Sequence, residues 1–217
     1  GCKNTVLNIK GNKIGLLICE DSWNFNNIYN EKLKNIDFLI SINASPYEKG
    51  KEKVRINFFR KLSKKHAFNL IYLNTIGGQD EIVFDGSSFI VDREGNIKKT
   101  FKSFAEESCN VLIDGGEFLE ESSFNTTNNI ADEEEALYEA IKLGTYDYIK
   151  KSKLSGILLG LSGGIDSALT LAVASDIFRK EDIEVVLLPS IYTSELSIQL
   201  AKEQCEILDI NYSIISI

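Results

Sequence analysis

Short apolar runs separated by polar turns dominate the first half of the chain. Four runs have the length and side-chain types of strands, and they are residues 13–19, 36–42, 70–74 and 88–92. Residues 51–66 predict a helix with one buried stripe, because apolar side chains recur at helical spacing with Lys and Arg between them. The stripe consists of Val54, Phe58, Phe59 and Leu62. Residues 93–96 predict a hairpin turn, since Gly95 adopts a positive φ at little cost.

An acidic segment without Lys or Arg separates the two halves of the chain. Residues 103–141 contain eleven Asp or Glu, and their middle, ESSFNTTNN, has no apolar periodicity. We interpret this segment as a solvated connector, and an acidic docking tail is the alternative. The pattern predicts a domain over 1–121, a linker over 122–135 and a second domain over 136–217.

Strands and helices alternate after the linker. A helix over about 132–151 leads into strands 156–161, 183–188 and 212–217, with helices 166–178 and 194–208 between them. In the helix over about 132–151, six residues are expected to face inward: Ala136, Leu137, Ala140, Ile141, Leu143 and Tyr148. The alternation predicts a parallel sheet covered by helices. Three strands are few for a doubly wound sheet, and the sequence has no Met, so we expect a longer parent protein.

Composition and charge favour a protein that acts on small molecules. The chain is 43% hydrophobic and carries a net charge of −8, which argues against a nucleic-acid partner or an anionic membrane. No run resembles a signal peptide or a spanning helix, so a cytoplasmic protein is expected. Four widely separated cysteines suggest neither a disulfide framework nor a zinc site.

Residues 160–167 form a glycine-rich loop between a predicted strand and a predicted helix. Gly163 and Gly164 let the backbone turn tightly, and the free N–H groups of a helix start attract phosphate. No Lys follows the glycines, so this is not the common GxxxxGK loop. An aspartate beside polyphosphate is repelled unless a cation intervenes, so Asp166 is predicted to bind Mg²⁺. The alternative is that Asp166 caps its helix and the glycines serve only the turn.

The loop sequence GLSGGIDS and the later segment LPSIYTS resemble the ATP pyrophosphatase domain of NAD synthetases. SGGxDS alone is shared with GMP and asparagine synthetases. The upstream segment LGTYDY, together with PSIYTS, narrows the resemblance to NAD synthetases. The resemblance implies a Rossmann-like parallel sheet of the N-type ATP pyrophosphatase class, with ATP split between its α and β phosphates. The residues that it implies for ATP binding, with Asp166 also as metal ligand, are Gly160, Leu161, Ser162, Gly163, Gly164, Ile165, Asp166 and Ser167.

Cys19 ends an apolar strand, where side chains face the ligand crevice of α/β folds. By itself such a cysteine is usually an inert buried thiol. However, the segments ICEDSW, NASPY with Gly50 and Lys51, and Asn74 with GGQDEIVFDG resemble, in this order, the glutaminase domain of glutamine-dependent NAD synthetases, which has the nitrilase fold. The resemblance implies that Cys19 attacks the carboxamide of glutamine, forms a thioester and releases ammonia.

Three further residues fall where this family contacts glutamine. Lys51 suits the substrate α-carboxylate, while Glu20 or Ser45 suits its ammonium group. Taken alone, Lys51 belongs to a solvated basic run over 49–65. An RNA-binding interpretation of that run is weaker, because Glu48 and Glu52 interrupt it.

A thiol needs a nearby base or cation to react at neutral pH, and Glu20 and Asp21 oppose a thiolate at Cys19. In the nitrilase pattern the activating Glu and Lys precede the cysteine by more than the 18 residues present here. We therefore expect these residues, and the remaining metal ligands, outside the chain, and no complete glutaminase turnover from the chain alone. His66 is expected to have a surface or capping role.

These resemblances predict an α/β fold class. The C-terminal part of a nitrilase-like sandwich is followed by the first βαβαβ unit of an NAD synthetase domain. The predicted function is amidation of deamido-NAD with ATP and glutamine-derived ammonia by a homo-oligomer, with glutamine, ATP, deamido-NAD and Mg²⁺ as ligands. One alternative is a nitrilase-type amidase with a regulatory nucleotide-binding domain. Another is an inactive binding or oligomerisation module.

Overall fold

The computed structural model describes residues 5–25, 29, 33–120, 122, 124 and 132–217. The chain divides into two compact units, residues 1–77 with 82–140 and residues 78–81 with 141–217. Much of the predicted linker, namely 123 and 125–131, lies outside the described residues, so its bounds stay a prediction. Within the described part, none of the helices combines the length and hydropathy needed to cross a bilayer.

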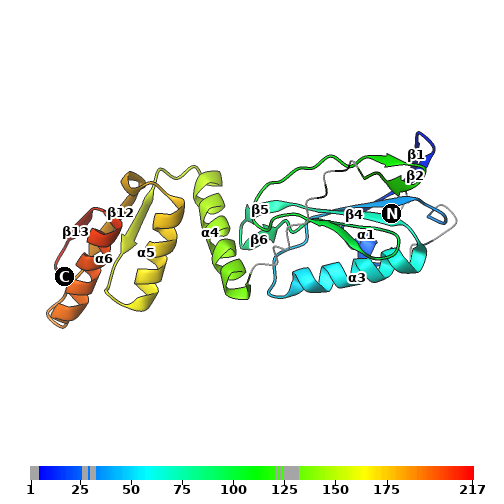
Figure 1. Cartoon of the computed structure of the whole chain (residues 1–217). Helices are drawn as coiled ribbons and strands as arrows, with labels where there is room; N and C mark the ends of the chain where they lie inside the picture. The colour runs from blue at the N-terminus through cyan, green and yellow to red at the C-terminus, as the bar shows by residue number, and fades with distance from the viewer. Residues whose placement is uncertain (1–4, 26–28, 30–32, 121, 123, 125–131) are drawn as a thin grey trace. The chain divides into compact units, whose positions relative to one another are not determined.

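A six-stranded mixed sheet in the order β1-β2-β3-β4-β7-β8 forms the centre of the first unit (Figure 1). Its strands are Thr5–Ile9 (β1), Asn12–Ile18 (β2), Phe38–Asn43 (β3), Asn69–Asn74 (β4), Phe89–Val91 (β7) and Ile97–Thr100 (β8). β2, β3 and β4 pair in parallel, and the other pairs are antiparallel. The carboxyl ends of β2, β3 and β4 therefore meet at one edge, which brings the residues after them together.

All four strands predicted in this half are present, and the predicted turn before β8 is confirmed. Its backbone closes through hydrogen bonds between Asp92 and Asn96 and from Gly95 N to Asp92 O. Five further strands were not predicted. They are β1 and two small antiparallel hairpins, β5 (Ile76–Gln79) with β6 (Ile82–Asp85) and β9 (Ile113–Asp114) with β10 (Glu117–Phe118).

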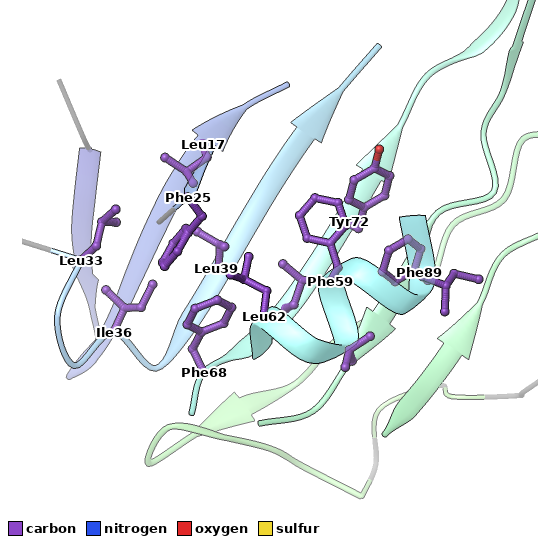
Figure 2. Packing of buried hydrophobic residues seen from close by; sticks show 13 residues of the cluster. Leu17, Phe25, Leu33, Ile36, Leu39, Phe59, Leu62, Phe68, Tyr72 and Phe89 are labelled. Carbon is purple, nitrogen blue, oxygen red and sulfur yellow. The ribbon is translucent and has the colours of Figure 1, made fainter. Parts of the chain in front are cut away.

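Helix α3 (Lys51–His66) covers one face of this sheet. Figure 2 shows Phe59 of α3 beside Tyr72 and Phe89 of the sheet, and Leu62 of α3 near Leu39, within one core. The predicted stripe is partly wrong, because Val54 is 59% exposed. The buried face is instead Arg55, Ile56, Phe59, Leu62 and Ser63. Phe59 and Leu62 were therefore predicted correctly, Phe58 is half-buried against the core, and Arg55 is buried with its charge neutralised by Asp85.

The second unit has the predicted order of strands and helices. Its elements are β11 (Ile157–Gly160), α5 (Ile165–Ile177), a 3₁₀ turn (Lys180–Asp182), β12 (Ile183–Leu187), α6 (Glu195–Leu208) and β13 (Tyr212–Ile214). The three strands pair in parallel in the order β11-β12-β13, which confirms the parallel sheet. Leu171 of α5, Val185 of β12 and Cys205 of α6 are fully buried in its core. The α/β fold class is therefore confirmed.

Helix α4 (Glu133–Lys151) has the predicted extent but not the predicted burial. Among its described residues only Ala140 is buried, whereas Leu137 is 49% and Tyr148 59% exposed. Ile141 is also exposed, and Ala136 and Leu143 are half-buried. The expectation of six inward residues is confirmed for Ala140 and wrong for the exposed ones, because helical spacing of apolar side chains defines a face without showing that another element covers it.

Candidate functional site

Cys19 occupies a strained turn between β2 and the short helix α1 (Glu20–Trp23). Its backbone has φ +48° and ψ −116°, a conformation that residues with a side chain rarely adopt. Such strain costs about 1–3 kcal/mol and persists only where the surroundings fix it. Positive φ at a non-glycine residue is often associated with a functional site, and here it turns the chain sharply at the carboxyl end of the sheet.

Hydrogen bonds from neighbouring elements hold this turn. The amide of Cys19 donates to the carbonyl of Ile42 on β3 at 2.8 Å. The carbonyl of Cys19 accepts from both the amide of Ser22, at 3.0 Å, and its hydroxyl, at 2.6 Å. Ser22 is itself fully buried and lies 3.4 Å from Asn43 Oδ1. The sheet edge thereby fixes the backbone that carries the thiol.

The four residues predicted for the glutaminase site line one pocket of about 740 Å³. The described residues that line it are Cys19, Glu20, Trp23, Ala44, Ser45, Pro46, Glu48, Lys49, Gly50, Lys51 and Val54. They come from the segments after β2 and β3 and from the first turn of α3. Parallel pairing of β2 with β3 explains why residues 26 positions apart, Cys19 and Ser45, share this pocket.

The walls of this pocket carry both charge signs. Lys51 begins α3 after Gly50, no side chain caps the helix, and Lys51 Nζ lies 3.3 Å from Glu48 Oε2. A cation beside an uncapped helix start suits a carboxylate. Glu20 and Glu48 suit an ammonium group. The pocket therefore offers complementary groups to both ends of an α-amino acid.

Two pocket features were not assigned from the sequence. Trp23 stacks on Phe58 with ring centroids 4.8 Å apart and forms an apolar wall. Lys49 adds a second cation and pairs with Glu133 at 3.2 Å. Trp23 was visible in the ICEDSW segment, but its inward direction depends on α3, which lies elsewhere in the sequence.

His66 belongs to an aromatic cluster rather than to this pocket. Its ring lies 5.0 Å from that of Phe25 and 4.7 Å from that of Tyr29, measured between centroids. Burial, followed by the charge of Lys65, lowers the pKa of His66. His66 is the last residue of α3, and its ring packs against aromatic side chains, so the surface or capping role stays a prediction.

The predicted phosphate loop lies between β11 and α5. Gly163 has φ +80°, and a Cβ atom there would overlap the carbonyl oxygen of Ser197 in the first turn of α6. Glycine is therefore required at this position. Gly164 is the residue before α5, and no side chain caps this helix. Because Asp166 lies inside the first turn, the alternative that its side chain caps α5 does not hold.

Two hydroxyl groups hold the loop together. Ser162 Oγ and Ser167 Oγ lie 2.9 Å apart, and Ser167 Oγ accepts from the amide of Ser162 at 3.2 Å. Ser162 Oγ in turn accepts from the amide of Gly164 at 3.3 Å. These hydroxyls are exposed, and an arriving oxyanion can take over the amide donors that they now satisfy.

A second pocket of about 280 Å³ lies beside this loop. Gly160, Leu161 and Ser162 line it together with Pro189 and Thr193 from the LPSIYTS segment. The two segments that carry the resemblance to NAD synthetases thus meet at the carboxyl ends of β11 and β12. Gly163, Gly164, Ile165, Asp166 and Ser167 do not line this pocket. The Leu161 side chain belongs to the core, which leaves its backbone for ligand contact.

The described residues provide few metal ligands. No group of three or more His, Cys, Asp or Glu lies together in the described part of the chain. Mg²⁺ is commonly held by one or two carboxylates with substrate phosphates and water. A single exposed carboxylate, Asp166, beside the predicted phosphate loop fits that mode of binding.

Comparison with protein families agrees with this division of the chain. Residues 2–117 match the carbon-nitrogen hydrolase family, and residues 137–217 match the NAD synthase family. The chain belongs to the carbon-nitrogen hydrolase family. The carbon-nitrogen hydrolase part contains the Cys19 pocket, and the NAD synthase match contains the phosphate loop.

Curated relatives of this carbon-nitrogen hydrolase share both parts. The glutamine-dependent NAD(+) synthetase of Acinetobacter baylyi is 37% identical over 219 residues, which cover 100% of this chain and 40% of the relative. The protein of the same name from Xanthomonas campestris is 36% identical and is covered to 39%. The chain therefore spans about 40% of the length of the curated relatives it matches.

Solved structures support the fold. The glutamine-dependent NAD+ synthetase of Acinetobacter baumannii, solved with adenosine diphosphate, superposes with a TM-score of 0.90 at 34% identity. That match covers 100% of this chain and 41% of the other. The glutamine-dependent NAD(+) synthetase of Cytophaga hutchinsonii has a TM-score of 0.76 at 18% identity, covers 98% and 40% of the two chains, and supports the fold alone.

Proposed function

We propose that the protein carrying this chain is a glutamine-dependent NAD synthetase. The observation that carries the proposal is the pocket that joins the Cys19 thiol to Ser45, Lys51 and Glu20. The similarity to glutamine-dependent NAD(+) synthetases over the whole chain supports the same function. The proposed substrates are glutamine, ATP and deamido-NAD.

In the glutaminase step, Cys19 Sγ attacks the carboxamide carbon of glutamine. The C–N bond breaks, the leaving nitrogen takes a proton and departs as ammonia, and an acyl thioester remains on Cys19. Water then attacks the thioester carbon, which releases glutamate and restores the thiol. Lys51 holds the substrate α-carboxylate, and Glu20 with Ser45 holds its α-ammonium.

In the synthetase step, the carboxylate of deamido-NAD attacks the α-phosphorus of ATP and pyrophosphate leaves. Ammonia then attacks the acyl carbon of the adenylate, AMP leaves, and the amide of NAD is formed. The loop 160–167 binds phosphate oxygens through its amides and the hydroxyls of Ser162 and Ser167. Asp166 would hold Mg²⁺, which when bound neutralises charge on the polyphosphate. That the enzyme is a cytoplasmic homo-oligomer stays a prediction.

Two substitutions in the full-length protein separate these steps. Cys19→Ala is expected to abolish NAD synthesis from glutamine while ammonium salts still support it, because only the nitrogen source is lost. Asp166→Ala is expected to lower synthesis from both sources by about a hundredfold or more, because phosphate charge is no longer neutralised. NAD formation measured with each nitrogen source checks both results, and Cys109→Ala, outside the pocket, serves as a matched control.

Either variant can overturn the proposal. Glutamine-dependent synthesis at the wild-type rate in Cys19→Ala would remove the thiol from the mechanism. An undiminished rate in Asp166→Ala would show that the loop does not bind the reacting nucleotide through a metal at this carboxylate.

A further inference from the structure

Arg55 lies in the second turn of α3 and is 1% exposed, although its helix neighbours include many solvated lysines. Its guanidinium donates to the carboxylate of Asp85, the last residue of β6, which is 2% exposed. Ser87 Oγ also donates to this carboxylate, at 2.7 Å. A buried ion pair therefore joins α3 to the end of the β5–β6 hairpin.

The polar groups of this pair are only partly satisfied. Arg55 Nε and Nη1 and the hydroxyl of Tyr72 make no hydrogen bond of standard geometry to any described residue. A buried ion pair stabilises a fold no better than apolar side chains of similar volume, and a half-satisfied one does worse. Violations of packing rules of this kind gather at functional sites. Stability alone therefore does not explain the arginine.

One side chain, that of Asn74, connects the carboxylate of Asp85 to the Cys19 pocket. Asn74, the last residue of β4, donates from Nδ2 to Asp85 Oδ1 at 3.4 Å and to the carbonyl of Ser45 at 3.1 Å. Asn74 Oδ1 accepts from the amide of Ser45 at 2.8 Å. One amide side chain thus holds both backbone polar groups of Ser45, a residue that lines the pocket.

The Tyr72 hydroxyl, one of the unsatisfied groups, lies close to Arg55 and to Ser45. Figure 2 shows its hydroxyl at the end of the ring farthest from its strand, beyond the aromatic side chains of the core. Burial raises the pKa of the Tyr72 phenol, and Arg55 and Ser45 act in the opposite direction as the neighbouring charge and hydroxyl. The Tyr72 hydroxyl therefore has both Arg55 and Ser45 as neighbours.

We propose that Arg55, Asp85 and Asn74 are positioning residues for substrate binding at the Cys19 pocket. The ion pair fixes the carboxylate of Asp85, the carboxylate orients the amide of Asn74, and Asn74 sets the backbone of Ser45 against the polar end of the substrate. This inference rests on the proposed glutaminase function and assigns the network to binding rather than to bond breaking.

The test uses the full-length protein and measures ammonia release from glutamine. Asn74→Ala and Asp85→Asn are expected to raise KM for glutamine about tenfold, the equivalent of one lost hydrogen bond, and to change kcat much less. NAD synthesis from ammonium salts, which bypasses the pocket, is expected to stay at the wild-type rate. This split between KM and kcat would not follow from general loss of fold.

Two further variants keep the result interpretable. The double variant Arg55→Met with Asp85→Leu removes both charges together, so that neither is left buried alone, and it is also expected to raise KM about tenfold. Asn69→Ala is the control, because Asn69 is also a hydrogen-bonded asparagine of β4 but lies at the opposite end of the strand, where it is fully buried. It is expected to lower stability without changing KM.

Wild-type KM in the folded double variant and in Asn74→Ala would overturn the inference. A parallel loss of ammonium-supported synthesis would also overturn it, since the network would then act on the whole fold. Failure of the proposed function is distinguishable, because wild-type protein would then release no ammonia from glutamine, or Cys19→Ala would still release it.

Discussion

Single residues in this chain occupy states that their types ordinarily avoid. Cys19 has a positive φ, and Arg55 and Lys99 are buried charges. Each is held by partners from elsewhere in the sequence, such as the carbonyl of Ile42 for Cys19 and the carboxylate of Asp85 for Arg55. These states depend on tertiary structure, so they are sensitive to changes in their partners.

The ion pair between Lys99 and Glu107 predicts a pH-dependent loss of stability. Lys99 Nζ lies 2.8 Å from Glu107 Oε1, and this hydrogen bond, with one from the amide of Lys102, holds the pKa of Glu107 below its usual value. A lowered folded-state pKa stabilises the fold above the unfolded pKa, and this contribution disappears as pH falls through the folded value. Glu107→Gln is expected to lower the free energy of unfolding at pH 7 by about 1 kcal/mol.

Urea unfolding of the two proteins at several pH values measures this effect. The difference between wild type and Glu107→Gln is expected to shrink as pH falls below about 4, where the carboxyl group becomes protonated. Glu106→Gln, at the exposed neighbouring position, is expected to change little at any pH. A difference that persists unchanged at low pH would contradict this account.

The role of a residue could be predicted where a short sequence segment indicated it. It could not be predicted where it depended on a partner far away in the sequence. Cys19, Ser45 and Lys51 were predicted from the order of short segments, and they line one pocket. Arg55 was assigned to the solvated side of its helix, because lysines surround it and Asp85 lies 30 residues away in a hairpin that was not predicted. Asn74 was part of the resemblance but was given no role, because its partners Ser45 and Asp85 lie elsewhere in the sequence.

At the scale of elements, the conformation of the predicted phosphate loop, residues 160–167, depends on α6, the helix that follows β12. Gly163 lies against the carbonyl of Ser197, in the first turn of α6, and Ser194 caps that helix by accepting from the amide of Ser197 at 3.1 Å. The loop and the start of α6 therefore fix each other. This contact explains one glycine of the SGGxDS motif by packing rather than by ligand binding.

Replacing that glycine is expected to weaken the second unit. Gly163→Ala adds a Cβ atom at a positive φ and against Ser197, which is expected to cost about 2 kcal/mol or more. Gly160→Ala, with no atom within 4 Å of the added Cβ, is the matched control for stability. Calorimetric unfolding of the full-length protein should show a transition lowered by several degrees in Gly163→Ala alone. Equal transitions in both variants would show that the loop tolerates a side chain.

Elements were predicted well where apolar periodicity and turn residues agreed. Apolar spacing directly predicts helices α3, α5 and α6 and strands β2, β3, β4, β7, β11, β12 and β13. Burial was predicted less well, because α4 presents apolar residues that the described units leave exposed. The short strands β5, β6, β9 and β10 lack the length that a period-two pattern needs to be recognised.

At the scale of the whole molecule, the chain joins two compact units with different pockets. The first contains a thiol beside groups that suit an amino acid, and the second contains a loop that suits phosphate. Composition and charge favoured small-molecule chemistry, and the order of motifs suggested the reaction. The family comparisons match each unit separately and the relatives match both together.

Isotope tracing in the full-length protein tests most directly the claim that the two pockets serve one reaction. Glutamine labelled with nitrogen-15 in its amide is supplied with deamido-NAD and Mg-ATP, and labelled NAD and AMP are measured by mass spectrometry. The account predicts label in the carboxamide of NAD, with one AMP formed per labelled NAD. Release of labelled ammonia with neither ATP consumption nor formation of labelled NAD would contradict the account. That result would favour an amidase with a regulatory nucleotide-binding domain.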